Sequence, residues 1–274
     1  MSTSALGAGL VLLATLIGIG VLLARPWWVE RRRERIRGRP FPSAWRRILR
    51  ERVPLVARLP ADLQMRLRRH ILVFLAEKSF VGCQGQAITD EVRVTIAAKA
   101  CLLLLGHPRS AYYPRLNEIL VYPDAFVVTR ERPVGAGVVQ EQRHATTGES
   151  WSRGQVILSW ADVLADAADP ADGRNVAIHE FAHQIDQDSG AADGVPWRPT
   201  AAAQRRFDRV TADAFGRLRA VPSMLIDSYA ATDRTEFFAV VSEVFFERPA
   251  ELAQEEPAVY DELAALYGVN PLAW

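Results

Sequence analysis

Residues 175–187 read NVAIHEFAHQIDQ, with two histidines four positions apart and a glutamate directly after the first. On a helix, His179 and His183 lie one turn apart on the same side, so both imidazoles can reach one ion. Imidazole suits zinc, and a catalytic zinc keeps a further position for water. Glu180 lies next around the helix, where it can face that water without becoming a ligand. The stretch therefore predicts a zinc-binding helix in which Glu180 acts as the general base of peptide hydrolysis.

The same helix also has a purely structural interpretation. It carries an apolar stripe, so it has a reason to pack without any metal; the stripe is formed by Ile178, Phe181, Ala182 and Ile185. The two histidines lie beside this stripe and not within it, so they are not simply core residues. This placement favours the zinc site.

A third protein ligand is expected for a hydrolytic zinc site. The later stretch DRTEFFAVVSEVFFE, residues 233–247, has an aromatic face and an acidic face with Glu236, Glu243 and Glu247. An acidic face opposite an aromatic face is also the usual pattern of a half-exposed helix. Asp186 and Asp188, just past the histidines, are further candidates. Periodicity alone does not choose among these carboxylates.

Elements elsewhere in the chain indicate the α+β class. Short β-branched and aromatic runs between Glu118 and Trp160 predict a small, largely antiparallel sheet. Helical patterns surround these runs, and grouped strands followed by helices favour α+β over a doubly wound sheet. The predicted helices span 43–52, 62–78, 89–105, 175–187, 201–218, 233–247 and 258–267. We therefore expect a mainly helical domain with a small sheet.

The N-terminus differs from the rest of the chain. Residues 1–24 carry no charged side chain, and seven arginines follow between Arg25 and Arg39. This pattern predicts one transmembrane helix at 1–24 and a basic, proline-containing arm at 25–60. By the positive-inside rule the domain at 61–274 would then lie in the cytoplasm, tethered to the inner membrane.

Charge and cysteine content exclude other classes of function. The 33 basic and 32 acidic residues nearly balance, so no direct binding of nucleic acid is expected. Cys83 and Cys101 are too few for a disulfide framework or a four-thiolate zinc site, and free thiols are the simplest interpretation.

Several longer segments resemble one family of enzymes. HEFAHQID, then Asp193, Gly194, Pro196 and Trp197, then YAATDRTEFFAVVSEVFFERP, are similar to zinc peptidases of the Mlc titration factor A family. AEKSFVGCQG, TDEVRVTIAAKACLLLL, ILVYPDAFVV and GQVILSWADV extend the resemblance over roughly residues 40–270. The N-terminal apolar segment is not a feature associated with the soluble members of this family.

This resemblance implies a zincin-like fold related to the catalytic domain of anthrax lethal factor. It implies Zn²⁺ bound by His179, His183 and Glu236, with Glu180 as general base and Tyr229 as a donor to the oxyanion. Glu243 lies two turns past Glu236 on the same face, where it either orients one of the ligands or is solvated. Aminopeptidase-like action on peptide substrates, and sequestration of a transcriptional repressor as an alternative function, are also implied. The substrate and the partner themselves are not readable from these residues.

Overall fold

The computed structural model describes residues 3–107, 111–133, 139–146, 148–151, 154–188, 190 and 192–274. Side chains are described at 12, 13, 15, 16, 18–107 and 111–125 and, outside the gaps just given, from 154 onward. The chain forms two compact units, Met1–Pro40 and Phe41–Trp274. The finer division predicted from the sequence, with a boundary at residue 60, stays a prediction.

The second unit contains the remaining helices and the strands. Its helices are α2 (Ser43–Arg52), α3 (Leu55–Arg58), α4 (Ala61–Glu77), α5 (Asp90–Leu102), α6 (Trp160–Ala168), α7 (Val176–Gln187), α8 (Ala201–Ala220), η1 (Ser228–Ala231), α9 (Arg234–Glu247), α10 (Pro249–Glu255), α11 (Pro257–Tyr267) and η2 (Pro271–Ala273). Its strands are β1 (Ser79–Gly82), β2 (Glu118–Tyr122), β3 (Phe126–Pro133), β4 (Val139–Thr146), β5 (Gly148–Trp151) and β6 (Gln155–Ser159).

Four of these strands form one sheet in the order β1-β2-β6-β5. β1 pairs with β2 in parallel, β2 pairs with β6 in parallel, and β5 pairs with β6 in the antiparallel direction. β3 and β4 form a separate antiparallel pair. Buried Ile119, Val121, Val156 and Leu158 give the centre of the sheet its apolar packing.

The prediction of a largely antiparallel sheet is therefore wrong. Parallel neighbours need a long crossover between them, and two segments supply one. α5 lies between β1 and β2 in the chain, and the segment from β3 to β5 lies between β2 and β6. The sequence pattern showed where most strands lie but not which strands pair, and the short strands β1 and β5 were not recognised.

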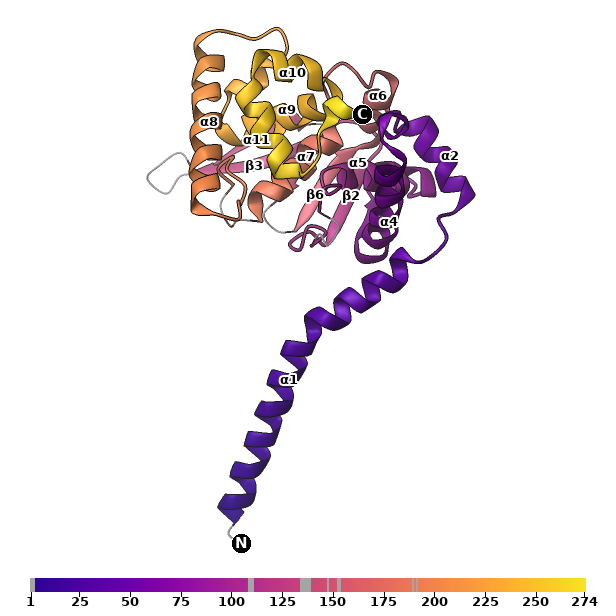
Figure 1. Ribbon diagram of the computed structural model, residues 1–274, viewed down its shortest axis with the longest axis vertical. Coiled ribbons are helices and arrows are strands. Elements are labelled where there is room, and N and C mark those ends of the chain that lie inside the picture. Colours follow the sequence, from indigo (N-terminus) through magenta and orange to yellow (C-terminus); the bar gives the residue numbers. More distant parts are fainter. Residues whose placement is uncertain are drawn as a thin grey trace. The chain divides into compact units, whose positions relative to one another are not determined.

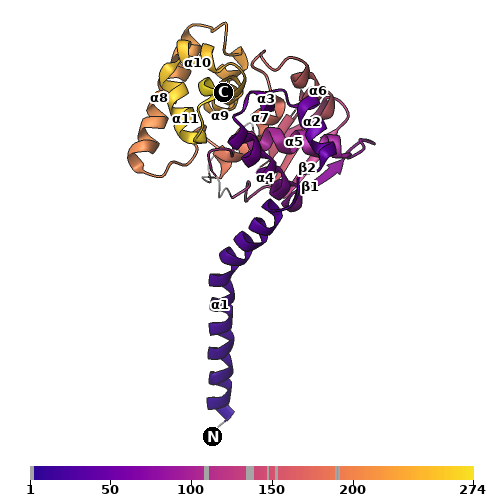
Figure 2. The ribbon, with the colours of Figure 1, turned by 45° about the vertical axis from the view of Figure 1, so that its right-hand side comes forward.

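Helix α7 occupies the centre of the second unit. Figures 1 and 2 show α8 to α11, coloured orange to yellow, gathered on one side of α7, and the sheet with α4 and α5 on the other. α7 packs against α9 on the first side and against α5, β5 and β6 on the second. Phe181 of α7 is fully buried, with its ring 5.0 Å from that of Tyr113 and 5.7 Å from that of Phe74. This packing holds the histidine helix rigidly between two layers.

The first unit is the long helix α1 (Thr3–Arg37). Among the residues that the structure describes, no helix has a stretch long and apolar enough to cross a membrane. The prediction of a transmembrane helix is therefore corrected. The predicted cytoplasmic location stays a prediction.

Candidate metal centre

The two histidine-bearing turns of α7 are positioned by the start of that helix. Asn175 precedes it in extended conformation, and its Oδ1 accepts a hydrogen bond from the Ile178 N–H at 3.2 Å. The Val176 N–H donates to Oδ2 of Asp166 at 3.1 Å. Two of the N–H groups that a helix start leaves without helical partners are therefore satisfied by side chains. The helix begins at a fixed residue, which fixes the direction of the histidines.

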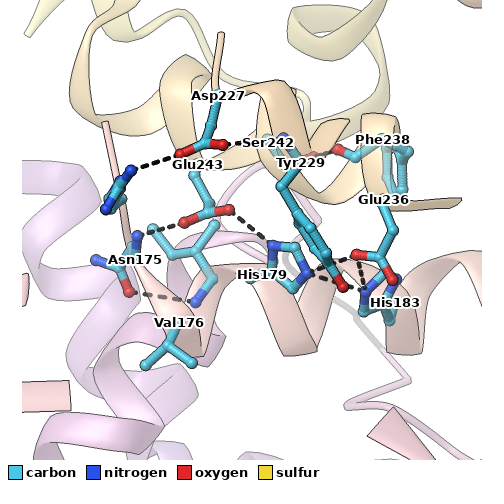
Figure 3. Close-up of polar contacts among 12 residues, drawn as sticks. Asn175, Val176, His179, His183, Asp227, Tyr229, Glu236, Phe238, Ser242 and Glu243 are labelled. Carbon is cyan, nitrogen blue, oxygen red and sulfur yellow. Dashed lines mark hydrogen bonds and ion pairs between the residues drawn. The ribbon is translucent and has the colours of Figure 1, made fainter. Parts of the chain in front are cut away.

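Helix α9 brings a carboxylate to the same place. Asp233 caps this helix by accepting from the Thr235 and Glu236 N–H groups at 2.9 and 3.0 Å. Glu236 stands in the first turn and points its carboxylate at the two histidines of α7 (Figure 3). Gly194 (φ +74°) lets the preceding loop approach, since a Cβ there would lie 2.2 Å from the Arg234 carbonyl oxygen.

Three donor atoms converge between these helices. Nε2 of His179 lies 3.0 Å from Oε2 of Glu236 and 3.1 Å from Nε2 of His183, and Nε2 of His183 lies 3.4 Å from Oε2 of Glu236. Of the described His, Cys, Asp and Glu residues, these three form the one group of at least three that is spaced to hold a metal ion.

The spacing of the three atoms fits a metal ion. For bonds of about 2.0–2.1 Å to a tetrahedral ion, neighbouring ligand atoms lie about 3.3 Å apart. The observed separations of 3.0, 3.1 and 3.4 Å bracket that value. Two imidazole nitrogens and one carboxylate oxygen are also a donor set that divalent transition metals accept. The residues present therefore suit a metal with three protein ligands.

The electrostatics of the cluster agree with this fit. Burial opposes a positive charge on His179, but the charge of Glu243 and the hydrogen bonds that Glu236 and Glu243 accept outweigh it and raise the His179 pKa well above its usual value. Burial likewise opposes a charge on Glu236, yet its hydrogen bonds to His179 and His183 lower the Glu236 pKa. The centre thus attracts positive charge.

Glu243 binds Nδ1 of His179, the ring nitrogen that does not take part in the cluster. Its Oε1 accepts from Nδ1 of His179 at 2.7 Å, and its Oε2 accepts from the main-chain N–H of Asn175. Because Nδ1 of His179 carries the proton for this bond, the lone pair of Nε2 points into the cluster. The side chain of Glu243 is only 9% exposed, so water screens this interaction little.

A second buried acid lies one helical turn farther along α9. Glu247 accepts from Nδ2 of Asn175 at 2.8 Å, and its residue exposure is 2%. Burial raises the Glu247 pKa to about 8, although the bond from Asn175 and the charge of Lys99 act in the opposite direction. Glu247 is thus largely protonated at neutral pH.

A buried ion pair completes the support of the helix start. Nζ of Lys99 lies 2.8 Å from Oδ2 of Asp166 and donates to the Val163 carbonyl at 3.0 Å. Burial raises the Asp166 pKa to about 6 against the lowering effect of Lys99. The sequence analysis did not identify Lys99, Asp166 or Asn175. A lysine inside the apolar run VTIAAKACLLLL was the available signal for the first of them.

The other residues singled out in the sequence lie in different positions. Glu180 is buried beside the cluster, and its charge acts on His179. Tyr229 is half exposed, its ring is 6.1 Å from that of His179, and its hydroxyl points toward the cluster (Figure 3). Asp186 is not part of the cluster, since its Oδ2 accepts from the Gly194 N–H at 2.8 Å. Asp188 lies beyond the end of α7.

Comparisons with known proteins support a metal-dependent peptidase. The family model described as glucose-regulated metallo-peptidase M90 matches residues 27–268. An uncharacterized protein of Synechocystis is 40% identical over 269 residues, which cover 96% of this chain and 97% of that protein. Mlc titration factor A of Klebsiella pneumoniae is 35% identical over 235 residues, 81% of this chain and 84% of that protein. Its counterpart in Salmonella agona is 36% identical over 231 residues, 80% and 84% of the two chains.

Proposed function

The chain belongs to the glucose-regulated M90 metallo-peptidase family, and we propose that it is a zinc-dependent peptidase that hydrolyses peptide bonds. The observation that carries the proposal is the convergence of two imidazole nitrogens and one carboxylate oxygen within 3.4 Å of one another. A buried glutamate adjoins them on the same helix. Such a set of three ligands leaves a fourth tetrahedral position for water or substrate.

In this proposal His179, His183 and Glu236 hold the zinc. When bound, zinc polarises a carbonyl group and lowers the pKa of water to about 7. Glu243 keeps His179 in the orientation and tautomer that the site needs, through its 2.7 Å bond to Nδ1. Asp186 takes no part in binding the metal and instead fixes the loop that follows α7.

Glu180 moves the proton during hydrolysis. Its carboxylate accepts a proton from the attacking water and then delivers it to the amine that leaves. The position of Glu180 directly after His179 supports this role, since its residue exposure of 4% keeps competing solvent away.

Tyr229 stabilises the charge that develops on the scissile carbonyl oxygen. The residue is 51% exposed, and its hydroxyl points toward the cluster (Figure 3). A donor in this position acts mainly in the transition state, so it contributes to rate more than to binding. Asp227 supports this placement by accepting from the Tyr229 N–H at 2.9 Å.

The sheet offers a means of holding an extended peptide. β6 lies between β2 and β5 and is therefore an interior strand. β5 is the edge strand of the described sheet on the side of α7. Main-chain pairing with β5 would align a peptide next to the cluster and make the backbone, not one side chain, the recognised feature. We further propose aminopeptidase-like action on short peptides.

The test is peptide cleavage by purified protein with a measured zinc content. We expect about one zinc per chain and cleavage of a peptide library, and we expect the free N-terminal peptides to be cut faster than their acetylated forms. Glu180→Gln should retain the zinc while hydrolysis falls roughly 10²- to 10⁴-fold, because the base is lost but the shape is kept. Undiminished cleavage by zinc-loaded Glu180→Gln protein would refute the mechanism.

A second candidate function is suggested by the name of these relatives. Proteins named Mlc titration factor A match about 80% of this chain. A regulator-sequestering protein that holds a transcriptional repressor, with a structural zinc, is the corresponding alternative. It predicts that neither wild type nor Glu180→Gln cleaves peptides while both capture the same repressor. Cleavage that depends on Glu180 favours the enzyme.

A further inference from the structure

A cavity of about 380 Å³ lies on a different side of α7 from the metal centre. Ile185 and Asp188, at the end of this helix, line it. Ile185 follows His183 by two residues and is therefore turned about 200° around the helix from it. The other walls come from the segment after α5, the loop around Trp197 and the last turn of α11. The volume is within the usual range of small-molecule sites, about 300–1,000 Å³.

The walls of this cavity are mainly apolar. Leu104, Tyr113 and Leu266 are among the residues that line it, and each is buried. Trp197, also part of the lining, is 64% exposed. Large aromatic side chains exposed next to an apolar cavity are typical of binding sites.

Arg198 is the unusual member of the lining. The residue is only 7% exposed, and its guanidinium lies 5.9 Å from the centre of the Phe207 ring. Its main-chain N–H donates to Gln204 at 2.8 Å, but within the described part of the chain its guanidinium donates no hydrogen bond. Nε of Arg198 is buried without a partner. A buried arginine normally has a hydrogen-bonded anion, because leaving its donors unmatched costs free energy.

No described carboxylate accepts a hydrogen bond from the Arg198 guanidinium. The charge of Glu262 acts on Arg198, but its Oε1 accepts from Arg206, and its Oε2 is buried without a hydrogen-bond partner among the described residues. The charged carboxylate and guanidinium that line the cavity are thus Asp188 and Arg198, and the positive charges of Arg115 and Lys78 act on Asp188.

We propose that this cavity binds a small amphipathic carboxylate, with the carboxylate on Arg198 and the apolar chain against the buried walls. A guanidinium offers two parallel N–H donors that match a carboxylate, so it distinguishes an acid from an alcohol of the same shape. When the ligand binds, its apolar chain covers the apolar surface at the open side of the cavity, so that this surface no longer contacts water. This site is separate from peptide hydrolysis, and its test needs no enzymatic activity.

The experiment is calorimetric titration of the full chain, loaded with zinc, with decanoate, decanol and decylammonium. We expect decanoate to bind at least tenfold more tightly than decanol and decylammonium not to bind. Arg198→Gln should reduce decanoate affinity to that of decanol. Arg209→Gln removes one positive charge from an exposed position of α8 and serves as the matched control, which should bind as wild type.

A second variant separates this cavity from the metal centre, which can also attract a carboxylate. Ala265 is exposed and lines the cavity, so Ala265→Trp fills the space while leaving every charge and the metal cluster in place. We expect it to abolish decanoate binding, and circular dichroism establishes that each variant is folded. Undiminished binding in Ala265→Trp, or equal affinity of the wild type for decanoate and decanol, overturns the proposal. If Arg198→Gln does not fold, Ala265→Trp decides.

Discussion

Replacing Glu243 by glutamine tests how the metal centre is supported. Both oxygens of this carboxylate accept hydrogen bonds, one from Nδ1 of His179 at 2.7 Å and one from the Asn175 main-chain N–H. A glutamine has one acceptor oxygen and one NH₂ donor, so it satisfies only one of these two donors and opposes the other. Glu243→Gln is therefore not a conservative change at this position, although its size hardly differs.

The expected magnitude follows from the bond to His179. A hydrogen bond to a charged group is worth about 1.5–3 kcal/mol, and each 1.4 kcal/mol is a factor of ten in affinity. The side chains of Glu243 and His179 are 9% and 13% exposed, so solvent weakens this bond little. We expect zinc affinity to fall about 10- to 100-fold, the usual range for losing the partner of a metal-bound histidine.

Glu247→Gln is the matched control, because the same substitution is made one turn along the same helix. Glu247 accepts a hydrogen bond from Asn175 with one oxygen, and its other oxygen has no hydrogen-bond partner in the described part of the chain. Since the Glu247 pKa is raised to about 8 by burial, glutamine resembles the neutral acid already present. Zinc affinity should change by less than about threefold.

The assay is competition for zinc between the protein and a fluorescent chelator at pH 7, with thermal unfolding to show that both variants are folded. The reasoning is refuted if Glu243→Gln retains wild-type affinity. It is equally refuted if Glu247→Gln loses as much zinc affinity as Glu243→Gln. That result would mean that any substitution next to the start of α7 lowers the affinity, and not specifically the loss of the bond to His179.

Three further outcomes are expected. Glu236→Ala should lose both zinc and activity, and zinc retained at one per chain would remove Glu236 from the ligand set. Tyr229→Phe should keep its zinc while kcat falls roughly 10²- to 10³-fold, and a change in KM alone would contradict the role in charge stabilisation. Burial raises the Glu247 pKa to about 8 from an ordinary 4.5, so the folded state binds this proton more tightly than the unfolded state does. The wild type therefore loses stability as pH rises between these two values. Urea unfolding at pH 5.5, 7 and 8.5 should therefore show Glu247→Gln gaining stability relative to wild type as pH rises, and the opposite trend would contradict the buried acid.

Seven of the helices were predictable from helical periodicity, whereas α3, α6 and α10 were not predicted. Thr89, Asn175 and Asp233 are the first residues of three predicted ranges, and in the structure each is the residue that caps the helix following it. A cap is a contact between a side chain and N–H groups two or three residues away, so the sequence contains all of it. The histidine spacing is local in the same sense, which is why the pattern of His179 and His183 was informative.

The sheet was not predictable in the same way. Parallel pairing joins residues as far apart as Ser79 and Glu118, and nothing near either residue specifies the other. The strand pattern at Glu118–Trp160 suggested nearest-neighbour hairpins. Such pairs form between β3 and β4 and between β5 and β6, but β6 also pairs in parallel with the more distant β2. Strand pairing depends on tertiary contacts that periodicity does not contain.

The acidic face of α9 shows a further limit. The spacing of Glu236, Glu243 and Glu247 fits a solvent-exposed face, yet Glu243 and Glu247 are 7% and 2% exposed. Periodicity shows that residues share a face but not what covers that face. Here the start of α7 covers it. The choice of Glu236 as ligand candidate came from the resemblance to a family, and the structure brings that residue to the histidines.

The buried charges behind the metal centre need an explanation other than stability. Removing ionic groups from water is costly, and apolar residues of similar volume often stabilise a fold at least as well. Lys99 and Asp166 nevertheless meet the start of α7 at Val176, while Glu243 meets it at Asn175 and continues to His179. We infer that these groups fix the position of the first turn of α7 and the tautomer of its first histidine, neither of which an apolar contact specifies. The Glu243→Gln measurement bears on this inference directly, since a group kept for orientation should change metal affinity more than it changes the free energy of unfolding.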